Sequence, residues 1–152
     1  MYKKILVPLD GSPTSERGFE EAVALARVMK SSLVLAHVID VLPLAVDMAP
    51  ATTWQDISDG LRKHGQGLLD RARQTATEHG VASETRLIEG RAEPVAVALV
   101  DLARSANCDL VVMGTHGRRG FSHALLGSDA ERLLRRCPVP VLLVRHPDAA
   151  KV

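Results

Sequence analysis

The sequence predicts an α/β domain in which short strands and helices alternate along the chain. Short continuous apolar runs recur, which is typical of strands that are covered on both faces. Between these runs, apolar residues repeat at helical spacing, and proline, glycine and serine separate the segments. Alternation of this kind predicts a mainly parallel sheet with right-handed crossovers and helices on both faces.

The length of 152 residues is enough for one domain with a full hydrophobic core. Hydrophobic residues make up 46% of the chain and charged residues 24%, a mixture that is typical of globular proteins. We find no internal repeat, low-complexity tract or linker. We therefore expect a single domain that spans residues 1–152.

The first half of the chain predicts two strands and two helices. One strand is expected over residues 2–9, and a helix should begin at Ser12-Pro13, because serine is a good cap and proline suits the first helical position. Residues 33–39 predict a second buried strand. Residues 40–52, with two prolines, predict a loop that could include a helical turn. A long helix then runs from Ile57 to near Gly80, which is a plausible C-cap.

The second half predicts the remaining elements. A weaker third strand over residues 81–88 alternates in part, which suggests the edge of the sheet. Pro94 opens a helix, and residues 109–113 form a fourth strand. Ser128 and Glu131 have the spacing of a capping box at the start of a short helix. The last strand, from Val139 to Val144, follows two prolines.

A glycine-rich segment between the fourth strand and the last helix indicates an anion site. Gly114, Gly117, Gly127 and Ser128 follow the pattern Gly-x2-Gly-x9-Gly-Ser. Glycines let the backbone approach a ligand closely, and the free N–H groups at a helix N-terminus favour negative charge. The favoured ligand is a phosphate, although turn glycines and a capping serine would give the same residues. The pattern is not a Walker A motif, because no Gly-Lys-Ser/Thr is present.

Composition argues against several other classes of function. The formal net charge is +1 and aromatic residues make up 3%, so we expect no nucleic-acid partner. No apolar run approaches the roughly 20 residues needed to cross a bilayer, so we expect a cytoplasmic protein without a membrane anchor. We interpret Cys108 and Cys137 as small, buried hydrophobic residues, and His37 as a hydrogen-bonded histidine of the core.

The whole chain resembles the universal stress protein family, in its single-domain, ATP-binding form. Four segments carry this resemblance, namely residues 5–12, residues 37–40, the glycine pattern and residues 137–144. The resemblance implies a Rossmann-like, doubly wound sheet of five parallel strands in the order 3-2-1-4-5, with helices on both faces. Strands one and four are then neighbours whose connections leave in opposite directions, and ligands bind at such a switch point.

The resemblance also implies roles for residues at that crevice. Pro8 and Val38 would line an adenine pocket, with Val38 acting through its backbone. Asp10 would lie beside the ribose or the Mg²⁺-bearing phosphates, although an Asx-turn before Ser12 would also explain this aspartate. The residues expected to bind ATP are Pro8, Asp10, Val38, Gly114, His116, Gly117, Arg118, Arg119, Gly120, Gly127 and Ser128.

Charges near the glycine pattern have opposite consequences for a polyphosphate. His116, Arg118 and Arg119 give the loop positive charge, or they are solvated loop residues. Asp129 suits the first turn of a helix but would repel a terminal phosphate. A diphosphate or AMP could therefore bind better than ATP.

No catalytic constellation stands out, so the expected function is that of a dimeric, ATP-binding stress-response regulator with an unknown protein partner. The resemblance implies a homodimer formed through the last strand, which is also a strand edge that needs covering. Two alternatives stay open. One is an interaction module that binds no nucleotide, and the other is a slow ATPase or autokinase.

Overall fold

The computed structural model describes residues 1–39, 51–89, 93–115 and 126–146. Strands and helices alternate throughout, as the sequence predicts. The elements are β1 (Lys4–Pro8), α1 (Pro13–Met29), β2 (Ser32–Ile39), α2 (Ala51–Glu78), β3 (Ser83–Glu89), α3 (Val95–Ser105), β4 (Leu110–Gly114), α4 (Ser128–Arg136) and β5 (Val141–Val144).

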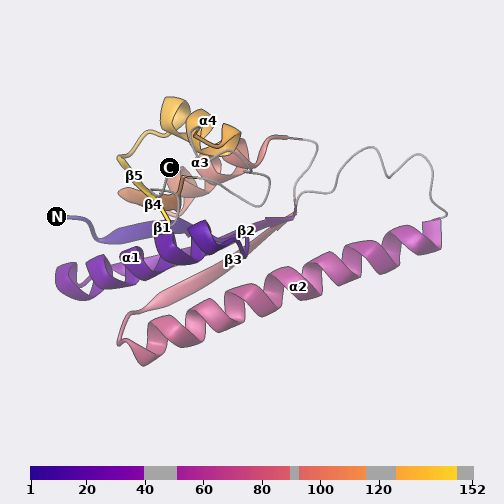
Figure 1. Cartoon of the computed structure of the whole chain (residues 1–152), viewed down its shortest axis with the longest axis horizontal. Helices are drawn as coiled ribbons and strands as arrows, with labels where there is room; N and C mark the ends of the chain where they lie inside the picture. Colours follow the sequence, from indigo (N-terminus) through magenta and orange to yellow (C-terminus); the bar gives the residue numbers. More distant parts are fainter. Residues whose placement is uncertain (40–50, 90–92, 116–125, 147–152) are drawn as a thin grey trace.

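The five strands form one parallel sheet in the order β3-β2-β1-β4-β5, which confirms the predicted fold (Figure 1). Leu6 at the centre of β1 lies opposite Val34 of β2 and Val111 of β4. The middle of β1 and the whole of β4 are buried, because helices cover both faces of a parallel sheet. β3 lies at one edge, as its partial alternation predicts, and β5 lies at the other.

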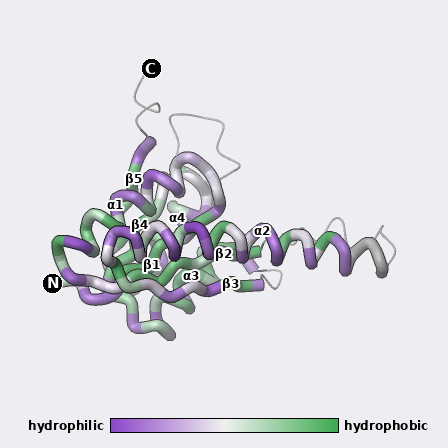
Figure 2. Tube along the Cα trace, turned by 90° about the horizontal axis from the view of Figure 1, so that it is seen from below, coloured by the Kyte–Doolittle hydropathy of each residue, from purple (hydrophilic) through white to green (hydrophobic). Residues whose placement is uncertain are grey.

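Two apolar clusters, one on each face of the sheet, form the core. Helices α1 and α2 pack on one face with Ile5, Leu33 and Leu35, and helices α3 and α4 pack on the other with Leu6 and Val34. In Figure 2 the most hydrophobic tube segments lie in the strands between these helices. Because successive strand residues face opposite ways, a continuous apolar strand supplies both clusters.

Helix ends test the predicted caps. Ser12 caps α1: its hydroxyl accepts a hydrogen bond from the Ser15 N–H at 3.2 Å. Gly80 has a positive φ of 72° just after α2, as expected of a C-terminal glycine. The predicted capping box at Ser128 is wrong. The extended cap residue is Gly127, so Ser128 is already helical, and Glu131 pairs with Arg135 at 2.9 Å rather than with a cap.

Two boundaries also differ from the prediction. Helix α2 begins at Ala51, so residues 51–52 are helical rather than loop, while residues 40–50 lie outside the described part. Its N-terminal half extends past the ends of β2 and β3 (Figures 1 and 2). β5 begins at Val141 rather than Val139, although the Pro140 carbonyl already accepts a bond from the Val111 N–H at 3.0 Å.

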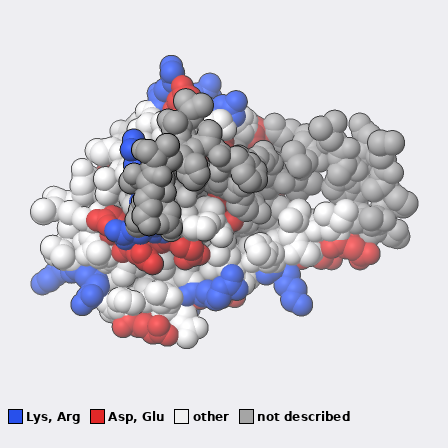
Figure 3. All heavy atoms as spheres, viewed as in Figure 1, with Lys and Arg blue, Asp and Glu red and all other residues white. Residues whose placement is uncertain are grey.

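In the described ranges, no helix is long and apolar enough to cross a membrane. On the face drawn in Figure 3, acidic and basic side chains are mixed rather than gathered by sign. That a single domain spans residues 1–152 stays a prediction.

Candidate functional site

The carboxyl ends of β1 and β4 define the candidate site. These strands are neighbours at the centre of the sheet. From β1 the chain continues through α1 towards β2, and from β4 through α4 to β5, so the two connections leave in opposite directions and on opposite faces. An open α/β sheet binds ligands at such a switch point.

Asp10 lies in the turn that joins β1 to α1 at this edge. Its Oδ1 accepts a hydrogen bond from the Ser12 N–H at 2.8 Å, which is an Asx-turn. The Asp10 N–H in turn donates to the Ser15 hydroxyl at 3.3 Å, and Gly11 has a positive φ of 78°. The turn therefore holds a half-buried carboxylate at the switch point. The predicted Asx-turn accounts for an aspartate at position 10 whether or not the site binds a ligand.

Pro8 and Val38 lie where the β1–β2 ladder ends. The last paired residues are Pro8 and Ala36, and the Leu9 N–H donates to the Ala36 carbonyl at 2.7 Å. In a β-strand, every second residue points its N–H and C=O groups at the same neighbouring strand. Val38, like Ala36, therefore points these groups towards β1. The Val38 side chain is buried under α3. Any contact of this residue with a ligand at the edge would therefore run through its backbone.

Gly114 ends β4 and packs against the first turn of α1. A Cβ at this position would lie 2.6 Å from the Thr14 carbonyl oxygen, and a Cβ at Gly18 would lie 3.0 Å from the Gly114 nitrogen. The backbone at the end of β4 lies directly against α1, so both glycines are needed for the two elements to pack this closely. The sequence predicted Gly114 as a phosphate residue and missed Gly18, whose signal was a glycine inside a helix.

Thr115 joins the two ends of the glycine pattern. Its N–H donates to the Val144 carbonyl and its carbonyl accepts from the Gly127 N–H, at 3.0 and 2.9 Å. The start of α4 is thereby held against the end of β4, although the intervening residues 116–125 lie outside the described part. Sequence reasoning missed this buried threonine, and no local pattern marked it.

The N-terminus of α4 presents Ser128 at the same edge. This side chain is exposed, while Asp129 is half-buried in the same first turn. The predicted site residues within the described ranges lie at carboxyl ends of strands, in the following turn or at the start of α4, namely Pro8, Asp10, Val38, Gly114, Gly127 and Ser128. The remaining predicted residues, His116, Gly117, Arg118, Arg119 and Gly120, lie outside the described ranges.

Metal and thiol chemistry find little support in the described residues. No group of three or more His, Cys, Asp or Glu side chains that could hold a metal ion occurs among them. Asp10 could contribute one carboxylate to a Mg²⁺ ion held mainly by phosphates, which is the usual arrangement for this ion. Burial raises the pKa of the Cys108 thiol to about 11, so this cysteine is a poor nucleophile.

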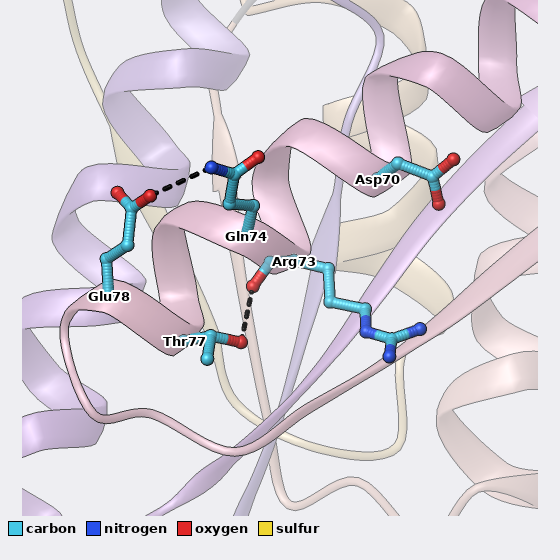
Figure 4. Close-up of a pocket in the computed structure, with 5 residues that line it drawn as sticks. All are labelled: Asp70, Arg73, Gln74, Thr77 and Glu78. Carbon is cyan, nitrogen blue, oxygen red and sulfur yellow. Dashed lines mark hydrogen bonds between the residues drawn. The ribbon is translucent and has the colours of Figure 1, made fainter.

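A shallow pocket elsewhere does not belong to this site. It is lined by five residues of α2 alone, Asp70, Arg73, Gln74, Thr77 and Glu78 (Figure 4). Two of the polar groups are engaged within the helix, since Gln74 donates to Glu78 at 3.0 Å and Thr77 to the Arg73 carbonyl at 2.9 Å. This end of α2 precedes β3 and therefore lies at the amino edge of the sheet.

Comparison with known proteins decides the family. The sequence profile described as the universal stress protein family matches residues 1–145. The chain belongs to the universal stress protein family. Among curated members, universal stress protein MJ0531 of Methanocaldococcus jannaschii is 36% identical over 147 residues, which cover 97% of this chain and 84% of that protein.

Solved structures share the fold. The structure of a protein named MJ0577 has a TM-score of 0.86 and 25% identity, and the match covers 97% of this chain and 99% of that one. A universal stress protein solved in complex with cAMP has a TM-score of 0.66 and 26% identity, with 95% and 97% covered. The family and the fold predicted from the sequence are thus both confirmed.

Proposed function

We propose that this protein binds an adenine nucleotide, as MgATP, at the carboxyl edge between β1 and β4. The observation that carries the proposal is the Thr115–Gly127 hydrogen bond. This bond holds the N-terminus of α4 beside the end of β4. Asp10, which follows the neighbouring strand β1, lies at the same edge of the sheet. A solved relative that holds cAMP supports the adenine nucleotide as the ligand class.

Each part of the nucleotide has a candidate partner in this arrangement. The backbone of Val38, past the last β1 partner, would recognise the base in the pocket that Pro8 borders. The N–H groups at the start of α4, together with Ser128, would bind phosphate oxygens. Asp10 would lie near the ribose or would contribute a carboxylate to Mg²⁺. The loop residues 116–120 would complete the phosphate contacts.

The nucleotide would serve a regulator rather than drive rapid turnover. We propose that occupancy changes the surface that this dimeric stress-response protein offers to a partner protein in the cytoplasm, as a population shift between conformations. The dimer would form through β5. The half-buried Asp129 favours one rival, an interaction module without nucleotide, because its carboxylate lies in the first turn of α4.

A charge placed at Ser128 tests the proposed ligand position. In a Ser128→Glu variant, the carboxylate would favour the N-terminus of α4 but repel phosphate, so stability and affinity should move in opposite directions. We expect calorimetric titration of MgATP into nucleotide-stripped protein to show affinity at least about tenfold weaker, a cost of about 1.4 kcal/mol.

A matched control carries the same charge change elsewhere. Gln66 is exposed on α2, so Gln66→Glu adds one negative charge at a surface position outside the candidate site. This control should bind MgATP like the unmodified protein. Equal affinities for Ser128→Glu and Gln66→Glu would remove α4 from the phosphate site and contradict the proposal.

A further inference from the structure

His37 is a buried polar side chain that contacts the end of β1. It lies in β2, one residue before Val38, and is 4% exposed. Its ring Nδ1 lies 2.7 Å from the Leu9 carbonyl oxygen. Because a carbonyl oxygen can only accept, Nδ1 carries the proton and donates this bond. The side chain therefore ties β2 to the residue that precedes Asp10.

This bond stands at the point where the β1–β2 ladder would otherwise continue. The last rung runs from the Leu9 N–H to the Ala36 carbonyl. In a longer parallel ladder the next rung would run from the Val38 N–H to the Leu9 carbonyl. In the described part of the chain, this carbonyl accepts from the imidazole. A side chain thus takes the place of the next backbone rung at the end of β1.

Gly65 of α2 makes room for the ring. A Cβ at Gly65 would lie 2.6 Å from His37 Cδ2 and 2.8 Å from Leu87 Cδ1. Real Cβ atoms do not come so close, so any larger residue would push the imidazole away from its place. Gly60, five residues earlier in the same helix, has no atom within 4 Å of such a Cβ. Gly65 and Gly60 of α2 thus differ in whether they leave room for a side chain.

We propose that His37 is a positioning residue for the nucleotide site. Its Nδ1–H bond holds the Leu9 carbonyl, and with it the Asp10 turn, at a fixed place relative to the Val38 backbone. The base and ribose of one ligand would span these two groups, so their spacing sets affinity. This inference rests on the proposed function, because it names the residue that keeps the two halves of that site in register.

Two substitutions at His37 separate positioning from packing. His37→Leu keeps an apolar body and removes the donor, while His37→Asn places an amide N–H donor close to the position of Nδ1. We expect His37→Leu to weaken MgATP binding about tenfold or more, and His37→Asn to stay within about threefold of the unmodified protein. Unfolding midpoints in urea should fall in both variants.

The pair Gly65→Ala and Gly60→Ala tests the same bond from the helix. Gly65→Ala should displace the ring and weaken MgATP binding, whereas Gly60→Ala should leave binding unchanged. The pair also decides the question if His37→Leu does not fold. The inference would be overturned if Gly65→Ala bound MgATP as tightly as Gly60→Ala does. It would also be overturned if His37→Leu bound MgATP as tightly as the unmodified protein. His37 would then be a core residue only.

Amide hydrogen exchange without nucleotide distinguishes failure of this inference from failure of the proposed function. In His37→Leu, the amides of Leu9 and Ser12 should exchange faster than in His37→Asn, because the turn they hold has lost its anchor. If the unmodified protein bound no MgATP, the nucleotide role of His37 would fall with the proposed function. The exchange rates would still decide whether His37 positions Asp10, and equal rates would show that it does not.

Discussion

Glycines at the centre of this molecule act first through backbone contacts. Gly114 belongs to the pattern that predicts a phosphate loop, yet a Cβ there would meet the backbone and the methyl group of Thr14, and a Cβ at Gly18 would meet the Gly114 nitrogen. A glycine motif can therefore serve packing and ligand binding with the same residue. A variant that adds a side chain at Gly114 would confuse the two effects.

We predict that Gly114→Ala destabilises the protein by about 1–3 kcal/mol, the usual cost of overpacking. The added Cβ would lie 2.6 Å from the Thr14 carbonyl oxygen, and backbone cannot move aside as a flexible side chain can. Urea unfolding of Gly114→Ala beside Gly67→Ala measures the difference, since a Cβ at Gly67 makes only an ordinary contact at 3.6 Å. Equal midpoints for the two variants would contradict this packing role.

Asp129 gives a second prediction at the residue scale. Its carboxylate lies in the first turn of α4, where it would repel the terminal phosphates of ATP more than the single phosphate of AMP. In an Asp129→Asn variant, affinity for MgATP should rise about 2- to 5-fold relative to affinity for AMP, as expected for a partly exposed charge pair. Calorimetry with both nucleotides measures this ratio. An unchanged ratio would show that Asp129 does not discriminate between them.

At the scale of elements, α2 is held to the sheet by its apolar face rather than by its ion pair. Leu69 is fully buried against the sheet, whereas Arg62 and Glu89 form an exposed pair, 2.7 Å between Nε and Oε1, near the end of β3. The pair lowers the pKa of Glu89, chiefly through its hydrogen bond with Arg62. Solvent screens such a pair, so we assign it little weight in stability.

We predict that Leu69→Ala costs about 2–5 kcal/mol of stability, as large-to-small core substitutions do. Glu89→Gln should leave the urea midpoint at pH 7 nearly unchanged. Since folding lowers the pKa of Glu89, its small contribution is present above the ordinary carboxyl pKa and is lost as the pH falls through the lowered value. Urea midpoints measured at pH 7 and pH 4 check both statements. A larger loss from Glu89→Gln than from Leu69→Ala would reverse this ranking.

The sequence predicted the strands well because their burial leaves a local signal. Runs such as Ile5-Leu6-Val7 are apolar on both faces, and the Ser12-Pro13 start of α1 is a local cap. The strand order came from the family resemblance rather than from periodicity. Contacts between residues of different elements could not be predicted, because they depend on how the elements pack. These contacts are Gly18 against Gly114, Gly65 against His37, and the Thr115–Gly127 hydrogen bond. The spacing of Ser128 and Glu131 likewise did not reveal that the cap residue of α4 is Gly127.

At the scale of the whole molecule, β5 is the open edge on which the proposed dimer depends. Leu142 of this edge strand is 38% exposed. The unpaired N–H and C=O groups of an exposed edge strand can form hydrogen bonds with a strand of another chain. We predict that the protein sediments at about twice the 16.4 kDa mass of one chain at micromolar concentration. Leu142→Glu should yield monomers, and Leu134→Glu, on a half-exposed leucine of α4, serves as the control. A monomer for the unmodified protein would exclude the dimer.

The proposed nucleotide would occupy the edge of the sheet between β1 and β4. The most direct measurement is an NMR titration of nucleotide-stripped, isotope-labelled protein with MgATP, followed through the backbone amides. We predict saturable shifts at Val38, Thr115, Gly127 and Ser128, and none along Asp70 to Glu78. Shifts confined to α2, or no shifts at millimolar MgATP, would contradict the proposed site.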